Sequence, residues 1–178
     1  MTLVHDKIFY TYRDITPEFL TSEGISALLI DIDNTLAPYE QPHHDDNHEA
    51  WFQAMSDAGI GCALISNNDA ERVRIFAEGL NVPAYPDSGK PSRKYLKIAL
   101  SELGVDASRA AVLGDQLLTD CLSARRMKMK AYIVPPIKDK TNLFFKSKRL
   151  LERSTVKKYL KEHPEANIDY EHTVWSKW

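Results

Sequence analysis

The chain lacks the features that would set it apart from ordinary globular proteins. It has only two cysteines among 178 residues, Cys62 and Cys121, and both lie in apolar surroundings, so we expect buried thiols and no disulfide framework. No apolar run approaches the roughly 20 residues that a membrane-spanning helix needs, and no basic stretch followed by an apolar segment opens the sequence. We therefore expect a soluble, cytoplasmic protein without a processed leader.

The charge is unevenly distributed along the chain. Residues 138–163 carry nine Lys and Arg against three acidic residues, whereas residues 1–137 have an excess of acidic residues. The length and a hydrophobic content of 43% fit one globular domain. We predict a core at residues 1–137 and a basic helical C-terminal extension at 138–178 that is packed on the core or attached to it. The charge asymmetry suggests that the extension binds a surface.

Short apolar runs alternate with helical patterns along the core. The runs cover residues 27–32, 60–65, 82–85, 110–113 and 131–134. The expected helix starts are Asp45–Asn47, Asn68 or Asp69, and Ser92, and the expected ends are Gly59, Gly79 and Gly104. This alternation predicts an α/β fold, a three-layer doubly wound parallel sheet, with the first, second and fourth runs near its centre.

Polar residues follow the apolar runs where a doubly wound sheet gathers its functional groups. Asp31 and Asp33 are two positions apart, which puts both carboxylates on one face if the strand continues that far. Asp115 follows another central run. Three carboxylates at this edge predict an oxygen-rich site suited to Mg²⁺, although each Asp alone could merely cap a helix or a turn.

The segment Asp31-Ile32-Asp33-Asn34-Thr35 followed by Leu36 resembles the DxDxT motif of phosphatases of the haloacid dehalogenase (HAD) superfamily. The other motifs of that superfamily follow in order: Ser66 after an apolar strand, Lys90-Pro91 before a helix, and GDQLLTD at residues 114–120. The resemblance implies a HAD-like fold, Mg²⁺ as cofactor and hydrolysis of a phosphate ester.

The resemblance also implies a role for each motif residue. Asp31 would be the nucleophile that becomes phosphorylated, and Asp33 would protonate the leaving alcohol and then activate water. Phosphate binding is implied for Thr35, Ser66, Asn67 and Lys90. Asp115 would bind the metal together with the Asp31 carboxylate and the Asp33 carbonyl. Asp120 would orient water or Lys90. For Asn34, Asn67 and Asn68 the alternative is to fix a loop.

The histidines at 43, 44 and 48, with Asp45 and Asp46, resemble a second metal site only superficially. They lie where a solvated helix start is expected, and no separated partner motif of the usual ligand spacing accompanies them.

The gaps between the motifs leave no room for a cap domain, so the chain resembles the capless (subfamily IIIA) branch. Three passages resemble the YqeG-type family, which is related to the phosphatidylglycerophosphatases: residues 14–20, the GDQLLTD segment, and residues 141–144 with 149–152. This narrower resemblance implies phosphatidylglycerophosphate at a membrane surface as substrate.

The tail bears on that substrate independently. Its apolar residues fall on opposite helical faces before and after Ser154-Thr155, which predicts two short helices with Ser154 as N-cap. Basic residues in 138–163 beside Phe144, Phe145 and Tyr159 would dock on anionic lipid, as a peripheral contact; the alternative is a basic face packed on the acidic body. Trp175 and Trp178 are candidate interfacial anchors, unless the terminus is disordered.

Two other functions fit parts of the sequence. One is a capless phosphatase of a phosphoprotein, a nucleic-acid end or a soluble ester. The other is a non-catalytic HAD-like adaptor that binds nucleic acid or a ribonucleoprotein through the basic tail. The four clustered charges at Asp31, Asp33, Lys90 and Asp115 argue against the adaptor, because a module without catalysis does not need them.

Overall fold

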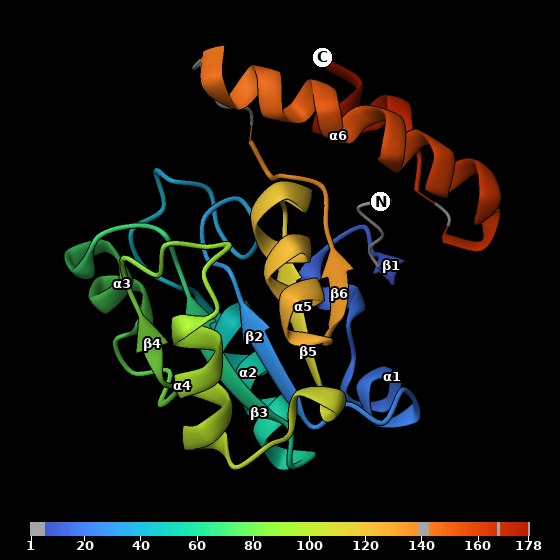
Figure 1. Ribbon diagram of the computed structural model, residues 1–178. Coiled ribbons are helices and arrows are strands. Elements are labelled where there is room, and N and C mark those ends of the chain that lie inside the picture. Colours follow the sequence, from blue (N-terminus) through green and yellow to red (C-terminus); the bar gives the residue numbers. More distant parts are fainter. Residues whose placement is uncertain (1–5, 139–142, 167, 178) are drawn as a thin grey trace.

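A computed structural model of the chain describes residues 6–138, 143–166 and 168–177, with the backbone alone at 143–151 and 177 (Figure 1). Six strands form one sheet in the order β1-β6-β5-β2-β3-β4, and all neighbouring strands are parallel. The strands are β1 (Lys7–Ile8), β2 (Ala27–Ile30), β3 (Gly61–Ile65), β4 (Ala84–Tyr85), β5 (Ala110–Gly114) and β6 (Lys130–Ile133). The predicted doubly wound parallel sheet is confirmed.

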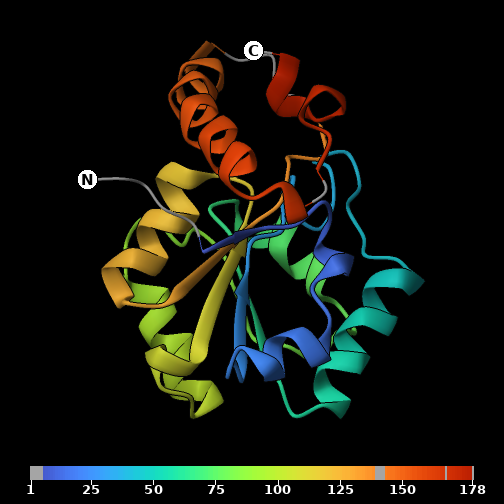
Figure 2. The same ribbon diagram turned by 90° about the vertical axis from the view of Figure 1, so that its right-hand side faces the viewer.

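Helices cover both faces of the sheet (Figure 2). They are α1 (Pro17–Ser22), α2 (Asp46–Asp57), α3 (Ala70–Ala77), α4 (Lys94–Leu103), α5 (Leu122–Met127) and α6 (Leu143–Glu162). On β2, Leu28 and Ile30 pack against α1, α2 and α3, whereas Ala27 and Leu29 pack against α4 and α5. Because strand side chains alternate between faces, one apolar strand serves two cores.

The expected strands all form, and three elements escaped the sequence analysis. Strand β1 is two residues long and pairs with β6 at the edge of the sheet, and α1 is a short helix capped by Thr16, whose hydroxyl accepts the Phe19 N–H at 3.2 Å. A π-helical turn, η3 (Leu117–Cys121), leads from β5 into α5. Elements this short bury too few residues to show a periodicity.

The local helix signals hold at most ends. Asp45 caps α2 and Asp69 caps α3, where its carboxylate accepts the Arg72 N–H at 2.9 Å. Gly104 ends α4 with φ +64°, a left-handed conformation that glycine adopts without a steric penalty. Helix α4 begins one residue later than expected, at Lys94, and its N-cap is Arg93.

No cap domain interrupts the core. The chain between Asp33 and Ser66 forms a loop, α2 and β3, and the chain between Ser66 and Lys90 forms α3 and β4. The prediction of a capless architecture is confirmed.

The predicted break in the C-terminal helix is wrong. Residues 143–162 form one continuous helix, α6, without an N-cap at Ser154. The segment has no Gly or Pro, and its Lys, Arg, Leu and Glu residues are good helix formers, so propensity keeps the helix intact through the change of apolar face. The side chains of Phe144 and Phe145 lie outside the described residues.

Helix α6 packs on the core at η3. Val156 is fully buried in the α4–α5 core, and the Leu118 N–H donates to the buried Glu152 carboxylate at 3.1 Å. Trp175 is only 1% exposed and belongs to the same core, so its expected role as an interfacial anchor is wrong. Trp178 lies outside the described residues.

None of the helices in the described part of the chain combines the length and the apolar character that crossing a membrane requires. The division into a core at 1–137 and an extension at 138–178 stays a prediction.

Replacing Val156 with Ala tests how firmly α6 is docked. The loss of two buried methyl groups and the cavity left behind should lower the free energy of unfolding by about 2 kcal/mol. Lys161→Ala, at an exposed position of the same helix, should change it by less than about 0.5 kcal/mol. Urea denaturation followed by tryptophan fluorescence measures both, and equal values for the two variants would mean that α6 does not contribute to the core.

Candidate active site

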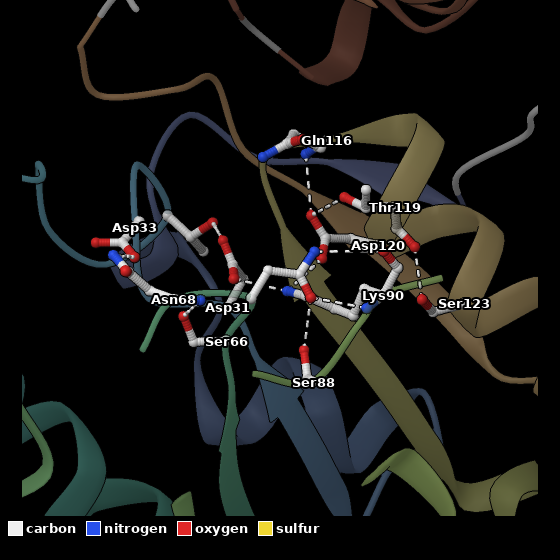
Figure 3. A network of polar contacts seen from close by, with 12 residues as sticks. Asp31, Asp33, Ser66, Asn68, Ser88, Lys90, Gln116, Thr119, Asp120 and Ser123 are labelled. Carbon is white, nitrogen blue, oxygen red and sulfur yellow. Dashed lines mark hydrogen bonds and ion pairs between the residues drawn. The ribbon is translucent and has the colours of Figure 1, made fainter. Parts of the chain in front are cut away.

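The predicted functional residues converge at the carboxyl edge of the sheet (Figure 3). Asp31 follows β2, Ser66 follows β3, Lys90 lies between β4 and α4, Asp115 follows β5, and Asp120 lies in η3. All five side chains are buried. Segments that are far apart in the sequence therefore place four charged groups in one water-poor site.

Lys90 joins two of the carboxylates directly. Its Nζ donates to Asp31 Oδ1 at 2.6 Å and to Asp120 Oδ1 at 2.7 Å. Burial opposes the charge of the ammonium group, but the carboxylates of Asp120 and Asp31 outweigh it and raise the pKa of Lys90. Lys90 is therefore a fixed cation at the centre of the site, as its expected role requires.

Asp31 experiences the opposite balance. The pKa of its carboxyl is raised to about 8. Burial is the largest cause of this rise, Lys90 lowers the pKa, and the charges of Asp120 and Asp115 raise it. The site holds three carboxylates against one ammonium group, so with all three acids ionised it is two positive charges short. A bound divalent cation would supply those charges.

The residues present fit such a cation. Carboxylate oxygens of Asp31, Asp115 and Asp120 lie within 4.8 Å of one another, and this is the one group of acidic, His or Cys side chains in the described part of the chain that could hold a metal. An all-oxygen donor set suits a hard ion such as Mg²⁺. Asp33 contributes no side-chain oxygen to the group; its expected ligand atom is the backbone carbonyl.

The fourth motif begins with a glycine, Gly114, because a side chain at this position would collide with Asp120. A Cβ at this position would overlap the carboxyl group of Asp120. The freed space lets Asp120 sit against the strand end, where its Oδ2 accepts the Gln116 N–H at 3.1 Å while its Oδ1 binds Lys90. Gly114 thus allows the contact that orients Lys90.

Asn67 holds the loop that carries Lys90. Its Oδ1 accepts the Lys90 N–H at 2.7 Å and the Ser88 hydroxyl at 2.8 Å, and its Nδ2 donates to the Lys90 carbonyl at 3.3 Å. Both ends of the amide are therefore engaged with residues 88–90. This is the loop-fixing alternative, and a contact of Asn67 with phosphate stays a prediction.

Two hydroxyl groups lie beside the carboxylates. Thr35 Oγ1 donates to Asp31 Oδ2 at 3.3 Å, and Ser66 Oγ accepts the Asn68 N–H at 3.0 Å. Both side chains are buried at the edge where phosphate is expected. Their phosphate contacts stay predictions that this placement allows.

Asp33 does not continue the strand beside Asp31 as expected. Strand β2 ends at Ile30, and the following residues form a turn. In this turn Asn34 has φ +66°, a left-handed backbone conformation that is incompatible with an extended strand. The turn directs the Asp33 carboxylate toward Asn68 (Figure 3) and toward Arg72 of α3. The sequence analysis did not single out Arg72, because one Arg in a charged helix usually marks a solvated face.

The histidines have structural contacts. Buried His48 binds the Asp45 carboxylate through Nδ1 at 2.6 Å and the Leu36 carbonyl through Nε2 at 3.0 Å. His44 Nδ1 lies 2.7 Å from the Phe76 carbonyl. Neither belongs to the group of possible metal ligands among the described residues, and His48 is buried at a helix start that was expected to be solvated.

Comparison with known proteins agrees with this architecture. A protein-family profile described as HAD-hydrolase-like matches residues 88–136. Among solved structures, the cobalt-bound deoxy-D-mannose-octulosonate 8-phosphate phosphatase from Haemophilus influenzae superposes with a TM-score of 0.52 at 20% identity, over 71% of this chain and 75% of that chain. A hypothetical protein from Xanthomonas campestris gives 0.53 at 16% identity, over 71% and 73%. At these identities the likeness shows the fold.

A curated relative is closer in sequence. The "Probable phosphatase YqeG" of Bacillus subtilis (strain 168) is 32% identical over 139 residues, which are 78% of this chain and 81% of the relative. The chain therefore belongs to the HAD-like hydrolases and, within them, to the YqeG-type family.

Proposed function

We propose that this protein is a Mg²⁺-dependent phosphomonoester hydrolase that works through an aspartyl-phosphate on Asp31. The observation that carries the proposal is the buried cluster in which Lys90 bridges Asp31 and Asp120, while carboxylate oxygens of Asp31, Asp115 and Asp120 lie within 4.8 Å of one another. The name of the curated relative, a probable phosphatase, supports the same reaction class.

In the first step an oxygen of ionised Asp31 attacks the phosphorus of the ester. The new P–O bond forms as the bond to the leaving alkoxide breaks, and Asp33 supplies the proton that the alkoxide needs. Lys90 and the hydroxyls of Thr35 and Ser66 stabilise charge on the phosphoryl oxygens. The carboxylates of Asp31 and Asp115, with the Asp33 carbonyl, would hold Mg²⁺, whose charge offsets the repulsion between carboxylate and phosphate.

In the second step water attacks the phosphorus of the aspartyl-phosphate. Asp33, now ionised, accepts a proton from the water, and the bond between phosphorus and the Asp31 oxygen breaks. Inorganic phosphate leaves, Asp31 returns as a carboxylate, and Asp33 is protonated again for the next substrate. Asp120 keeps Lys90 in place throughout, because its contact at 2.7 Å does not depend on the state of Asp31.

The proposed substrate is phosphatidylglycerophosphate at an anionic membrane surface. Helix α6 lies on the side of the molecule to which the strands point, as the catalytic residues do (Figures 1 and 3). Its residues Lys157, Lys158 and Lys161 are exposed. Each basic group near an anionic surface contributes about 1 kcal/mol of binding. The open, capless site would admit a headgroup that stays in its bilayer.

Asp31→Asn should abolish turnover, because an amide is a poor nucleophile and forms no acyl phosphate. We expect the Mg²⁺-dependent release of phosphate from an aryl phosphate to fall at least about 10³-fold. Asp57→Asn, at an exposed position of α2, is the matched control and should retain full activity. Substantial hydrolysis by the Asp31 variant would remove this residue from the mechanism.

Metal binding should depend on pH through Asp31. The pKa of the Asp31 carboxyl is raised to about 8, so below that pH Mg²⁺ must displace a proton from it. The Mg²⁺ concentration that gives half-maximal thermal stabilisation should therefore rise about tenfold from pH 7.5 to 6.5. At 100 times the dissociation constant Mg²⁺ should add about 2.7 kcal/mol to the free energy of unfolding. Thermal denaturation measures both effects, and Asp115→Asn should remove most of the stabilisation. A pH-independent midpoint would contradict the assignment of Asp31 as a ligand.

The lipid proposal is tested by charge reversal on α6. Lys158→Glu with Lys161→Glu should weaken sedimentation with vesicles that contain anionic lipid, and should lower the hydrolysis of phosphatidylglycerophosphate in them, without changing the hydrolysis of a soluble ester. Lys97→Glu, exposed on α4, is the control for the change of charge. Equal loss on both substrates, or no loss on either, would leave a phosphatase of soluble esters, phosphoproteins or nucleic-acid ends.

A further inference from the structure

The carboxylate of Asp33 is held from both sides by residues outside the four motifs. Asn68 Nδ2 donates to its Oδ2 at 3.0 Å, and the guanidinium group of Arg72 reaches its Oδ1 through Nε and Nη2, each at 3.1 Å. Asp33 is 5% exposed, and the side chain of Arg72 is 10% exposed. An ion pair this well shielded from water, with one hydrogen bond to each carboxylate oxygen, fixes the direction of the carboxylate.

Arg72 is itself rigidly placed. The cap at Asp69 sets the first turn of α3 and thus the position of the Arg72 backbone. Its Nη1 donates to the Pro42 carbonyl at 2.7 Å, and its guanidinium group lies 5.2 Å from the centre of the Phe76 ring. A side chain with this many contacts has lost its rotamer freedom before any substrate arrives, so it can serve as a fixed support for Asp33.

The direction that Arg72 imposes suits an acid that acts on the leaving group. In phosphoryl transfer the attacking and leaving oxygens are roughly in line on opposite sides of the phosphorus. A group that protonates the leaving oxygen must therefore lie beyond the phosphorus, away from the attacking carboxylate. The Asp33 carboxylate lies apart from Asp31 and Lys90, beside Asn68 (Figure 3), and its other partner is Arg72 of α3.

We propose that Arg72, assisted by Asn68, is the positioning residue that aims Asp33 at the leaving oxygen and stabilises the carboxylate that Asp33 becomes as it gives up its proton. This inference rests on the proposed function and deepens it, because it assigns to α3 the part of the site that controls departure of the alcohol. In this proposal Arg72 acts through Asp33 and not on the phosphoryl group itself. The other reading of the same contacts is that Arg72 only fastens the loop at Pro42 to α3.

The two readings differ in their dependence on the leaving group. An alkoxide is a poor leaving group and needs the proton from Asp33, whereas a dinitrophenolate departs without it. For Arg72→Met we expect kcat/KM to fall about 100-fold with an alkyl phosphate and less than about threefold with dinitrophenyl phosphate. The ratio kcat/KM reports the phosphorylation step, so any loss in the later attack of water does not enter it.

Conservative and matched variants complete the experiment. Arg72→Lys keeps the charge without the fork of donors. Its kcat/KM with the alkyl phosphate should be about tenfold higher than that of Arg72→Met. Arg74→Met, at an exposed position of the same helix, should behave as the unaltered protein with both esters. If Arg72→Met does not fold, Arg72→Lys still tests the idea, because it should show the same selective loss to a smaller extent.

Equal losses with the two esters would assign Arg72 to the loop alone and overturn the proposal, as would no loss with either. Asp33→Asn separates this failure from failure of the proposed function. If that variant loses the alkyl ester selectively while the Arg72 variants do not, the phosphatase stands and the positioning role falls. If the unaltered protein hydrolyses neither ester with Mg²⁺, the proposed function is wrong, and the positioning role that rests on it is wrong as well.

Discussion

The ion pairs of Lys90 are the contacts on which the rest of the site depends. Three acidic side chains at the ends of β2 and β5 and in η3 are buried, and burial of like charges is costly. Lys90 offsets part of this cost by binding Asp31 and Asp120 together. The supporting groups serve that contact: Asn67 fixes the loop of Lys90, and Gly114 makes room for Asp120.

The sheet could be predicted because its strands carry their own signal. The runs that became β2, β3 and β5 are apolar throughout, as strands buried on both faces must be, and the glycine and aspartate signals between them marked helix ends. Strand β1 has two residues and leaves no pattern. The course of α6 was mispredicted for a different reason: Val156 packs on η3 and the C-terminal segment packs beside the helix, so apolar residues on two faces have separate partners.

The candidate site was also only partly predictable from the sequence. Asp31, Lys90, Asp115 and Asp120 could be placed together from the motifs, because the carboxyl ends of parallel strands meet at one edge. The orientation of Asp33 could not be foreseen, since it depends on a turn with a left-handed residue at 34 and on a cation supplied by another helix. Motifs record which groups are present, whereas the angle of a side chain is set by neighbours that the motif does not contain.

The arrangement around Lys90 also bears on how the chain reaches its native state. Asp31 and Asp120 are 59 and 30 residues away from Lys90 in sequence, so a partly folded chain that pairs its central strands out of register would bury carboxylates with no ammonium group between them. Such a state would carry the cost of burying charged groups without a partner in addition to the cost of its lost packing. A chain that has closed its sheet correctly has therefore also assembled the charged cluster that we propose for hydrolysis.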